Sequence, residues 1–229
     1  MGVKKIAVRG GHCPNIPGAK AILDEVVEDR LIKNAVIKYL KKLGYEILDV
    51  TPPDSTSTLS SDLAYGVNKA NGWGADLFVS IHFNKAYNSY NGSIGSEVCV
   101  YSKYEIAQRV VDGLGSLGFK NRGQKIRTDL YELKNTTMSA MIIETCFVEA
   151  TEDVELYRKI GVDTIGKKIA ESIANKTIQV DTSNATSSTR EIYYRCIAGS
   201  FKEKSNAEKR KAELEEKGFT GVFLEAFNK

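Results

Sequence analysis

The sequence contains only two histidines, and each of them follows an apolar run that is typical of a buried strand. His12 follows the run IAVRGG, and His82 ends the run LFVSIH. Ligands of open α/β sheets bind at the carboxyl ends of parallel strands, so the two imidazoles are expected to meet at one edge of a sheet. Because imidazole nitrogens are common zinc ligands, the pair indicates a metal site.

Two imidazoles do not complete a catalytic zinc site, which usually takes three protein ligands and keeps one position for water. The chain has no third histidine, so a carboxylate is the expected third ligand. Four acidic residues open the helix predicted after the first strand, namely Asp24, Glu25, Glu28 and Asp29. An acidic first turn also complements the helix dipole, and the pattern does not select among the four. Cys13 is a weaker candidate, since it is adjacent to His12.

A further carboxylate interrupts a strongly apolar run in the second half of the chain. Residues 140–147 are apolar except for Glu144 and Thr145. Burial of an ionised carboxylate without a partner is costly, so Glu144 either reaches solvent at the end of a strand or acts as a general base beside a metal-activated water. These residues favour a metal-dependent hydrolase, and they do not say which bond is cut.

Alternating strands and helices, predicted over residues 1–180, must position these side chains. In the first long helix, Val27, Leu31, Ala35 and Leu40 keep helical spacing. Alternation of this kind predicts an α/β fold with a largely parallel, twisted sheet and helices on both faces. We expect strands at 4–9, 45–50, 74–82, 95–102, 130–134 and 140–147, and helices at 24–43, 63–73, 104–117, 151–159 and 162–176.

The composition changes near residue 181. Residues 181–190 read DTSNATSSTR, a polar stretch without periodicity that is typical of a flexible linker. We therefore expect a catalytic domain at 1–180, a linker at 181–190 and a small β-α-β module at 191–229.

The module is predicted as strand, helix and strand. The strands are expected at 191–201 and 221–227, Ser205 and Glu208 match a capping box, and Gly218 ends the helix at Lys217. A unit of this size buries little core, and both edges of its two-stranded sheet stay unpaired. We expect two such modules to pair, which predicts a homodimer.

Composition and charge exclude several classes of protein. Hydrophobic residues make up 42% of the chain and charged residues 27%, which is typical of a globular protein. The net charge of +3 argues against a nucleic-acid partner. The sequence has no membrane span of about eighteen apolar residues. Its first residues lack a signal-peptide pattern, so synthesis in the cytoplasm without a signal peptide is expected.

The segments around these residues resemble the zinc-dependent N-acetylmuramoyl-L-alanine amidases of bacterial cell-wall hydrolases and phage endolysins. The similarity covers about residues 3–176, in order. The most specific match is ANGWGADLFVSIHFN, which corresponds to Ala-Asn, a spacer, Ala-Asp and Ser-Ile-His-x-Asn. The other matching segments are VRGGHCPNIPGA, LDEVVEDRLIKNAVIKYLKKLGY and MIIETCFVEATEDVELYRK.

This resemblance implies roles for individual residues. His12, Glu25 and His82 would be the zinc ligands, with Glu28 as the alternative acidic ligand if the helix register shifts. Glu144 would be the catalytic base. Asn84, two residues after His82, matches a position that lines the substrate site. One departure is Gly66, which stands where the family often has an arginine.

The resemblance also implies the reaction and the place of action. The family cleaves the amide between the lactyl group of muramic acid and L-alanine of the peptidoglycan stem peptide. The alternatives are an inactive wall-binding protein and a zinc peptidase that acts within the stem peptide. The chain would reach the cell wall after release by a holin or by mother-cell lysis, and the sequence does not distinguish a phage endolysin from a host autolysin.

The tail resembles one half of the sporulation-related (SPOR) repeat, a module that binds glycan strands of peptidoglycan. The matching parts are the GSF turn and the helix that begins NAE. The resemblance implies a wall-binding role, with Tyr193, Tyr194 and Phe201 as candidates for stacking on sugar.

Overall fold

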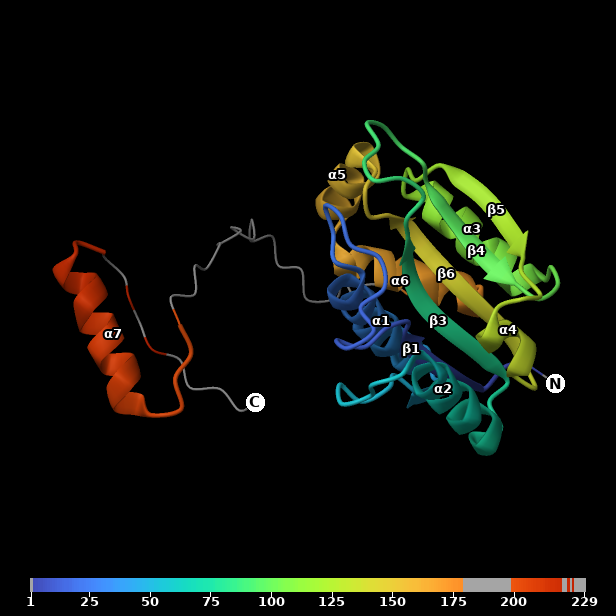
Figure 1. Cartoon of the computed structure of the whole chain (residues 1–229), viewed down its shortest axis with the longest axis horizontal. Helices are drawn as coiled ribbons and strands as arrows, with labels where there is room; N and C mark the ends of the chain where they lie inside the picture. Colours follow the sequence, from blue (N-terminus) through green and yellow to red (C-terminus); the bar gives the residue numbers. More distant parts are fainter. Residues whose placement is uncertain (1, 179–198, 220–221, 223, 225–229) are drawn as a thin grey trace. The chain divides into compact units, whose positions relative to one another are not determined.

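The computed structural model describes residues 2–178, 199–219, 222 and 224 (Figure 1). The chain divides into two compact units, Met1–Val180 and Asp181–Lys229. The first unit contains the sheet and both histidines, and the second contains one described helix. No helix among the described residues combines the length and the apolar character that a membrane span needs.

A six-stranded sheet with the order β2-β1-β3-β6-β4-β5 forms the centre of the first unit (Figure 1). Every neighbouring pair is parallel except β4 and β6, which are antiparallel. The largely parallel sheet predicted from the sequence is therefore confirmed. The strands are β1 Lys5–Gly10, β2 Glu46–Asp49, β3 Leu77–Asn84, β4 Ser96–Val100, β5 Asn121–Ile126 and β6 Ser139–Phe147.

Helices cover both faces of the sheet, as predicted. One face packs on α1, α3 and α6 through a large core that includes Val36, Val110 and Ile169. The other face packs on α2 and α4 through a smaller core that includes Ala70 and Leu133. The helices are α1 Glu25–Lys42, α2 Leu59–Trp73, α3 Glu105–Ser116, α4 Tyr131–Asn135, α5 Thr151–Ile160 and α6 Val162–Ala174.

The buried face of α1 contains two of the four predicted positions, Ala35 and Leu40, whereas Val27 and Leu31 are 52% and 44% exposed. The helix also buries other positions, among them Glu25, Asp29, Ile32 and Val36. These buried positions are also three or four residues apart, as expected for one face of a helix. Two of them, Glu25 and Asp29, are carboxylates, so a search for apolar residues alone does not find this face. The rotation of the helix thus turns the carboxylates of Glu25 and Asp29 towards the end of β1.

Two further sequence predictions were wrong. Of residues 130–134, predicted as a strand, Leu130 is the N-cap of α4 and the other four belong to that helix, in which Leu133 packs on the sheet. Leu130 and Leu133 are three residues apart, which fits a helical turn better than the period of two in a strand. The prediction also omitted β5, whose sequence NRGQKI is polar and half-exposed at the edge of the sheet.

In the second unit, the structure describes α7 Lys204–Glu216. The predicted capping box does not form: Ser205 lies inside the helix, and the N-cap residue Glu203 makes no side-chain cap bond. Gly218 ends the helix as predicted, with a φ of 87° and a hydrogen bond from the Phe219 N–H to the Leu214 carbonyl. The predicted linker and most of both predicted strands, with Tyr193, Tyr194 and Cys196, lie outside the described residues.

Candidate functional site

The two histidines and Glu25 come together at the carboxyl ends of β1 and β3. One oxygen of Glu25, Oε1, lies 3.3 Å from His12 Nε2 and 3.1 Å from His82 Nδ1. The three potential ligand atoms all lie within 4.8 Å of one another. Around a tetrahedral zinc ion with bonds of roughly 2.0–2.2 Å, neighbouring ligand atoms are separated by about 3.4 Å. The separations of this group therefore suit a zinc ion.

Backbone hydrogen bonds hold the carboxylate of Glu25 between the imidazoles. Glu25 is the first residue of α1 and is 3% exposed. Its Oε1 accepts a hydrogen bond from the Phe83 N–H at 2.9 Å, and its Oε2 accepts one from the Ala19 N–H at 2.6 Å. The carboxylate is thus oriented by the chain itself.

Each imidazole uses its second nitrogen on another part of the protein. His12 Nδ1 donates to the Ile16 carbonyl at 3.0 Å, which leaves Nε2 directed at Glu25. His82 Nε2 lies 3.1 Å from Ser80 Oγ, which leaves Nδ1 directed at the same carboxylate. Contacts of this type fix the tautomer and the ring orientation of metal-binding histidines.

Two glycines, which have no side chain, leave room for the imidazoles and for the carboxylate of Glu25. A Cβ on Gly11 would overlap the His82 ring, and a Cβ on Gly18 would lie 2.5 Å from His12 Nε2 and still closer to the Glu25 carboxylate. Gly18 also has a φ of 69°, which residues with side chains rarely adopt. Close packing around the imidazoles therefore requires glycine at these two positions of the loop after β1.

Negative charge concentrates around His82. Burial alone lowers the pKa of His82, but the hydrogen bond to Glu25 and the charges of Glu144, Glu25 and Glu132 raise it to about 9. For the carboxyl group of Glu25 burial acts in the opposite direction and raises the pKa. The contacts of Glu25 with both histidines outweigh burial and hold its pKa well below the usual value. The potential that favours a proton on His82 would equally favour a bound cation.

Glu144 lies beside this group on the neighbouring strand. Its register partner in β3 is His82, so the two side chains project from the same face of the sheet. Among the described residues, no group hydrogen-bonds its buried Oε2. Burial, more than any other cause, raises the pKa of Glu144, and despite the opposing charge of His82 that pKa is about 7. A carboxylate with this pKa can accept and return a proton near neutral pH.

The other residues named from the sequence lie around the group with contacts of their own. Glu28 accepts a hydrogen bond from the Tyr157 hydroxyl, and Asp29 accepts one from the His12 N–H. The thiol of Cys13 donates to the Thr56 carbonyl. Asn84 donates from its amide to Glu97. Of the carboxylates at the start of α1, the structure brings Glu25 into the three-residue group.

Sequence reasoning missed a buried ionic cluster beneath the site. Arg9, in β1, is 0% exposed and forms ion pairs with Asp62 of α2 at 2.5 Å and Glu132 of α4 at 2.9 Å. Its guanidinium lies against Gly66, where a Cβ would approach to 3.0 Å. The guanidinium of Arg9 thus occupies the space beside Gly66. An arginine in a buried strand was the only signal for this cluster.

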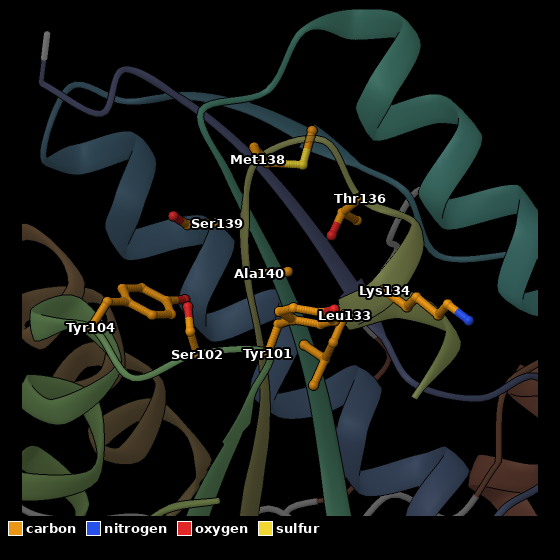
Figure 2. A pocket seen from close by; sticks show the side chains of 9 residues that line it. All are labelled: Tyr101, Ser102, Tyr104, Leu133, Lys134, Thr136, Met138, Ser139 and Ala140. Atoms are coloured by element: carbon orange, nitrogen blue, oxygen red, sulfur yellow. The ribbon is translucent and has the colours of Figure 1, made fainter. Parts of the chain in front are cut away.

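A separate pocket of about 300 Å³ lies near the start of β6 (Figure 2). Tyr101, Leu133, Met138 and Ala140 are among its lining residues. Glu144 is further along the same strand, and the pocket shares no residue with the histidine group.

Comparison with known proteins gives one consistent result. A family described as N-acetylmuramoyl-L-alanine amidase matches residues 6–175. The chain is 30% identical over 229 residues to the N-acetylmuramoyl-L-alanine amidase CwlM of Bacillus licheniformis, with 96% of this chain and 84% of the relative covered. It is 48% identical over 180 residues to an uncharacterized protein of Clostridium perfringens, with 76% of this chain and 53% of the relative covered.

A solved structure agrees. The catalytic domain of the CD27L endolysin targeting Clostridia Difficile superimposes with a TM-score of 0.70 at 29% identity, with 77% of this chain and 99% of that domain covered. The chain spans about half the length of the first curated relatives that it matches, 53% and 57%.

Proposed function

The chain belongs to the N-acetylmuramoyl-L-alanine amidase family, and from this premise we propose that it is a zinc-dependent peptidoglycan hydrolase. It cleaves the amide between the lactyl group of muramic acid and L-alanine of the stem peptide. The observation that carries the proposal is the position of Glu25 Oε1 between two imidazole nitrogens, with Glu144 one strand away.

His12, Glu25 and His82 would hold the metal. When bound, a zinc ion polarises the scissile carbonyl and lowers the pKa of water from 15.7 towards about 7. Glu144 takes the proton of the attacking water and delivers it to the leaving amine nitrogen. The attack forms the new C–O bond, and the amide C–N bond then breaks as Glu144 protonates the nitrogen. The products are a carboxylate on the glycan and a free peptide amine. Asn84 lines the substrate site.

Two other functions would use the same fold. An inactive wall-binding protein is disfavoured, because His12, His82 and Glu144 are all present in one place. A zinc peptidase that cuts within the stem peptide would keep the same metal group. Mass spectrometry of purified peptidoglycan after digestion separates the three: the amidase releases peptides with a new amino-terminal alanine, a peptidase exposes other amino termini, and a binder releases nothing.

We propose that residues 191–229 form a glycan-binding module that pairs with its copy in a homodimer. The support is α7, in which no residue is fully buried and the apolar residues Ala207 and Leu214 are only partly covered. Phe201, a candidate for stacking on sugar, is 45% exposed. Sedimentation of the full chain should show a dimer at tens of micromolar, and residues 1–180 should sediment as a monomer and bind glycan more weakly.

The wall is the expected place of action for either a phage endolysin or a host autolysin. The genes beside this one would distinguish the two, since an adjacent holin gene indicates a phage lysis cassette.

A further inference from the structure

One row of side chains crosses four strands at the level of the proposed base. His82 of β3 is the register partner of Glu144 in β6, and Glu144 is the register partner of Glu97 in β4. In β5, Arg122 forms an ion pair with Glu97, with Nε 2.7 Å from Oε2. The row therefore runs from imidazole to carboxylate, carboxylate and guanidinium on one face of the sheet.

A β-bulge directs Arg122 into this row. Between β4 and β5 the register passes from Ser96↔Asn121 to Val98↔Gln124, so β5 contains one extra residue opposite Glu97. Gly123 takes a φ of 76° at this point, and its N–H donates to Asn121 Oδ1. Bulges of this kind occur next to active sites, where they re-aim a side chain.

The guanidinium of Arg122 is fixed on two sides. Besides the bond from Nε to Glu97, it lies over the Phe147 ring at 5.2 Å from the ring centroid. Glu97 is 7% exposed, and its other oxygen accepts a hydrogen bond from the Asn84 amide at 3.1 Å. An arginine held in this way loses little conformational freedom when it binds a ligand.

The two terminal nitrogens of Arg122 are available to bind a ligand. The side chain is 33% exposed, and neither nitrogen has a hydrogen-bond acceptor among the residues that the structure describes. Parallel N–H groups of a guanidinium match the two oxygens of a carboxylate. The arrangement is therefore suited to an anionic group of a bound molecule.

In the proposed reaction the leaving peptide would begin beside Glu144, which lies between the metal group and Arg122. The base that returns a proton to the amine must be close to the amine nitrogen, so L-alanine lies beside Glu144. Arg122 is two strands further on, about 10 Å at the usual strand spacing. An extended peptide covers this distance in about three residues.

We propose that Arg122 is a substrate-binding residue that takes a carboxylate of the stem peptide, on the leaving-group side of Glu144. The proposal rests on the amidase function proposed above. It makes the enzyme selective for stem peptides whose second or third residue carries a free carboxylate over peptides in which that group is amidated.

The test uses the full-length zinc enzyme and two muramoyl tripeptides that differ only in free or amidated carboxylates. The native enzyme should have a KM about tenfold lower for the free carboxylates, which corresponds to one charge-assisted hydrogen-bonded contact. Arg122→Gln should abolish this preference by raising the KM of the carboxylate substrate, with kcat and zinc content unchanged. Arg122→Lys keeps the charge without the paired N–H groups and should recover only part of the preference.

Arg127→Gln is the matched control, because the guanidinium of Arg127 is already paired with Asp129 through two hydrogen bonds. It should retain the preference. A preference that persists in Arg122→Gln, or an equal rise in KM for both substrates, would overturn the role of Arg122. If the native enzyme hydrolysed neither tripeptide nor purified wall, the amidase function itself would fail; hydrolysis of both tripeptides with equal KM would reject only the carboxylate subsite.

Discussion

His82 and Glu144 are register partners on neighbouring parallel strands, and their side chains project from the same face of the sheet. The two neighbouring side chains are proposed to have different roles, metal binding for His82 and proton transfer for Glu144. His82 shares Glu25 with His12 at the metal group, whereas a buried oxygen of Glu144 has no hydrogen-bond partner among the described residues. Substitution of Glu144 should therefore lower the rate without loss of zinc, whereas substitution of His82 should weaken zinc binding.

Glu144→Gln should lower the rate of wall hydrolysis by a factor of about 10² or more, because the general base is lost. Zinc content should be unchanged, since Glu144 lies outside the ligand group. The thermal midpoint should not fall, because the change removes the charge of a half-buried carboxylate whose Oε2 is buried without a hydrogen bond among the described residues. Turbidity loss of purified cell walls, metal analysis and calorimetry measure the three properties. Near-normal lysis by this variant would show that another group acts as base.

Glu25→Gln should lose zinc, whereas Glu28→Gln should retain it. Glu25 contacts both imidazoles, but Glu28, one turn later, accepts a hydrogen bond from Tyr157. Removal of zinc from the native chain with a chelator should abolish activity, and added zinc should restore it. Zinc at 100 times its dissociation constant should also stabilise the fold by about 2.7 kcal/mol. Zinc retained by Glu25→Gln but lost by Glu28→Gln would reverse the assignment.

The positions of the two histidines could be predicted from sequence, because both are rare residues at the ends of apolar strands. Glu25 could not be selected without the family resemblance. The four carboxylates near the start of α1 are alike in sequence, and what distinguishes them is the rotation of the helix. That rotation depends on Ile32, Val36 and Leu40, which pack on the sheet while Val27 and Leu31 face solvent.

The contribution of β5 could not be predicted either. Its polar sequence has no alternation, because an edge strand that is half-exposed on both faces needs none. Arg122 was missed for the same reason. Arg9 was visible as a charge within an apolar strand, but its partners Asp62 and Glu132 belong to two helices that are distant in sequence, and one of those helices was predicted as a strand.

Arg9→Met should destabilise the fold by about 3–5 kcal/mol, because it leaves Asp62 and Glu132 buried without their cation. It also removes the hydrogen bonds from Arg9 to the Gly10 and Gly11 carbonyls, directly before His12. The denaturation midpoint in urea measures the loss. Arg127→Met is the control, since its ion pair is exposed to solvent and should change the midpoint little. Equal midpoints for both variants would contradict a structural role for the buried cluster.

Gly18→Ala and Gly74→Ala should separate backbone strain from damage to the metal group. The two glycines have nearly the same φ, 69° and 68°, so an alanine carries a similar backbone cost of roughly 1–2 kcal/mol at either position. A Cβ at Gly74 meets nothing within 4 Å, whereas a Cβ at Gly18 meets His12 Nε2 and the Glu25 carboxylate. Gly18→Ala should therefore weaken zinc binding by about tenfold or more, measured by competition with a chromogenic chelator. Gly74→Ala should lose similar stability and bind zinc normally. Equal zinc affinities in the two variants would mean that the loop after β1 moves away from the imidazoles without cost, and the close packing around Gly18 would then have no part in holding the metal.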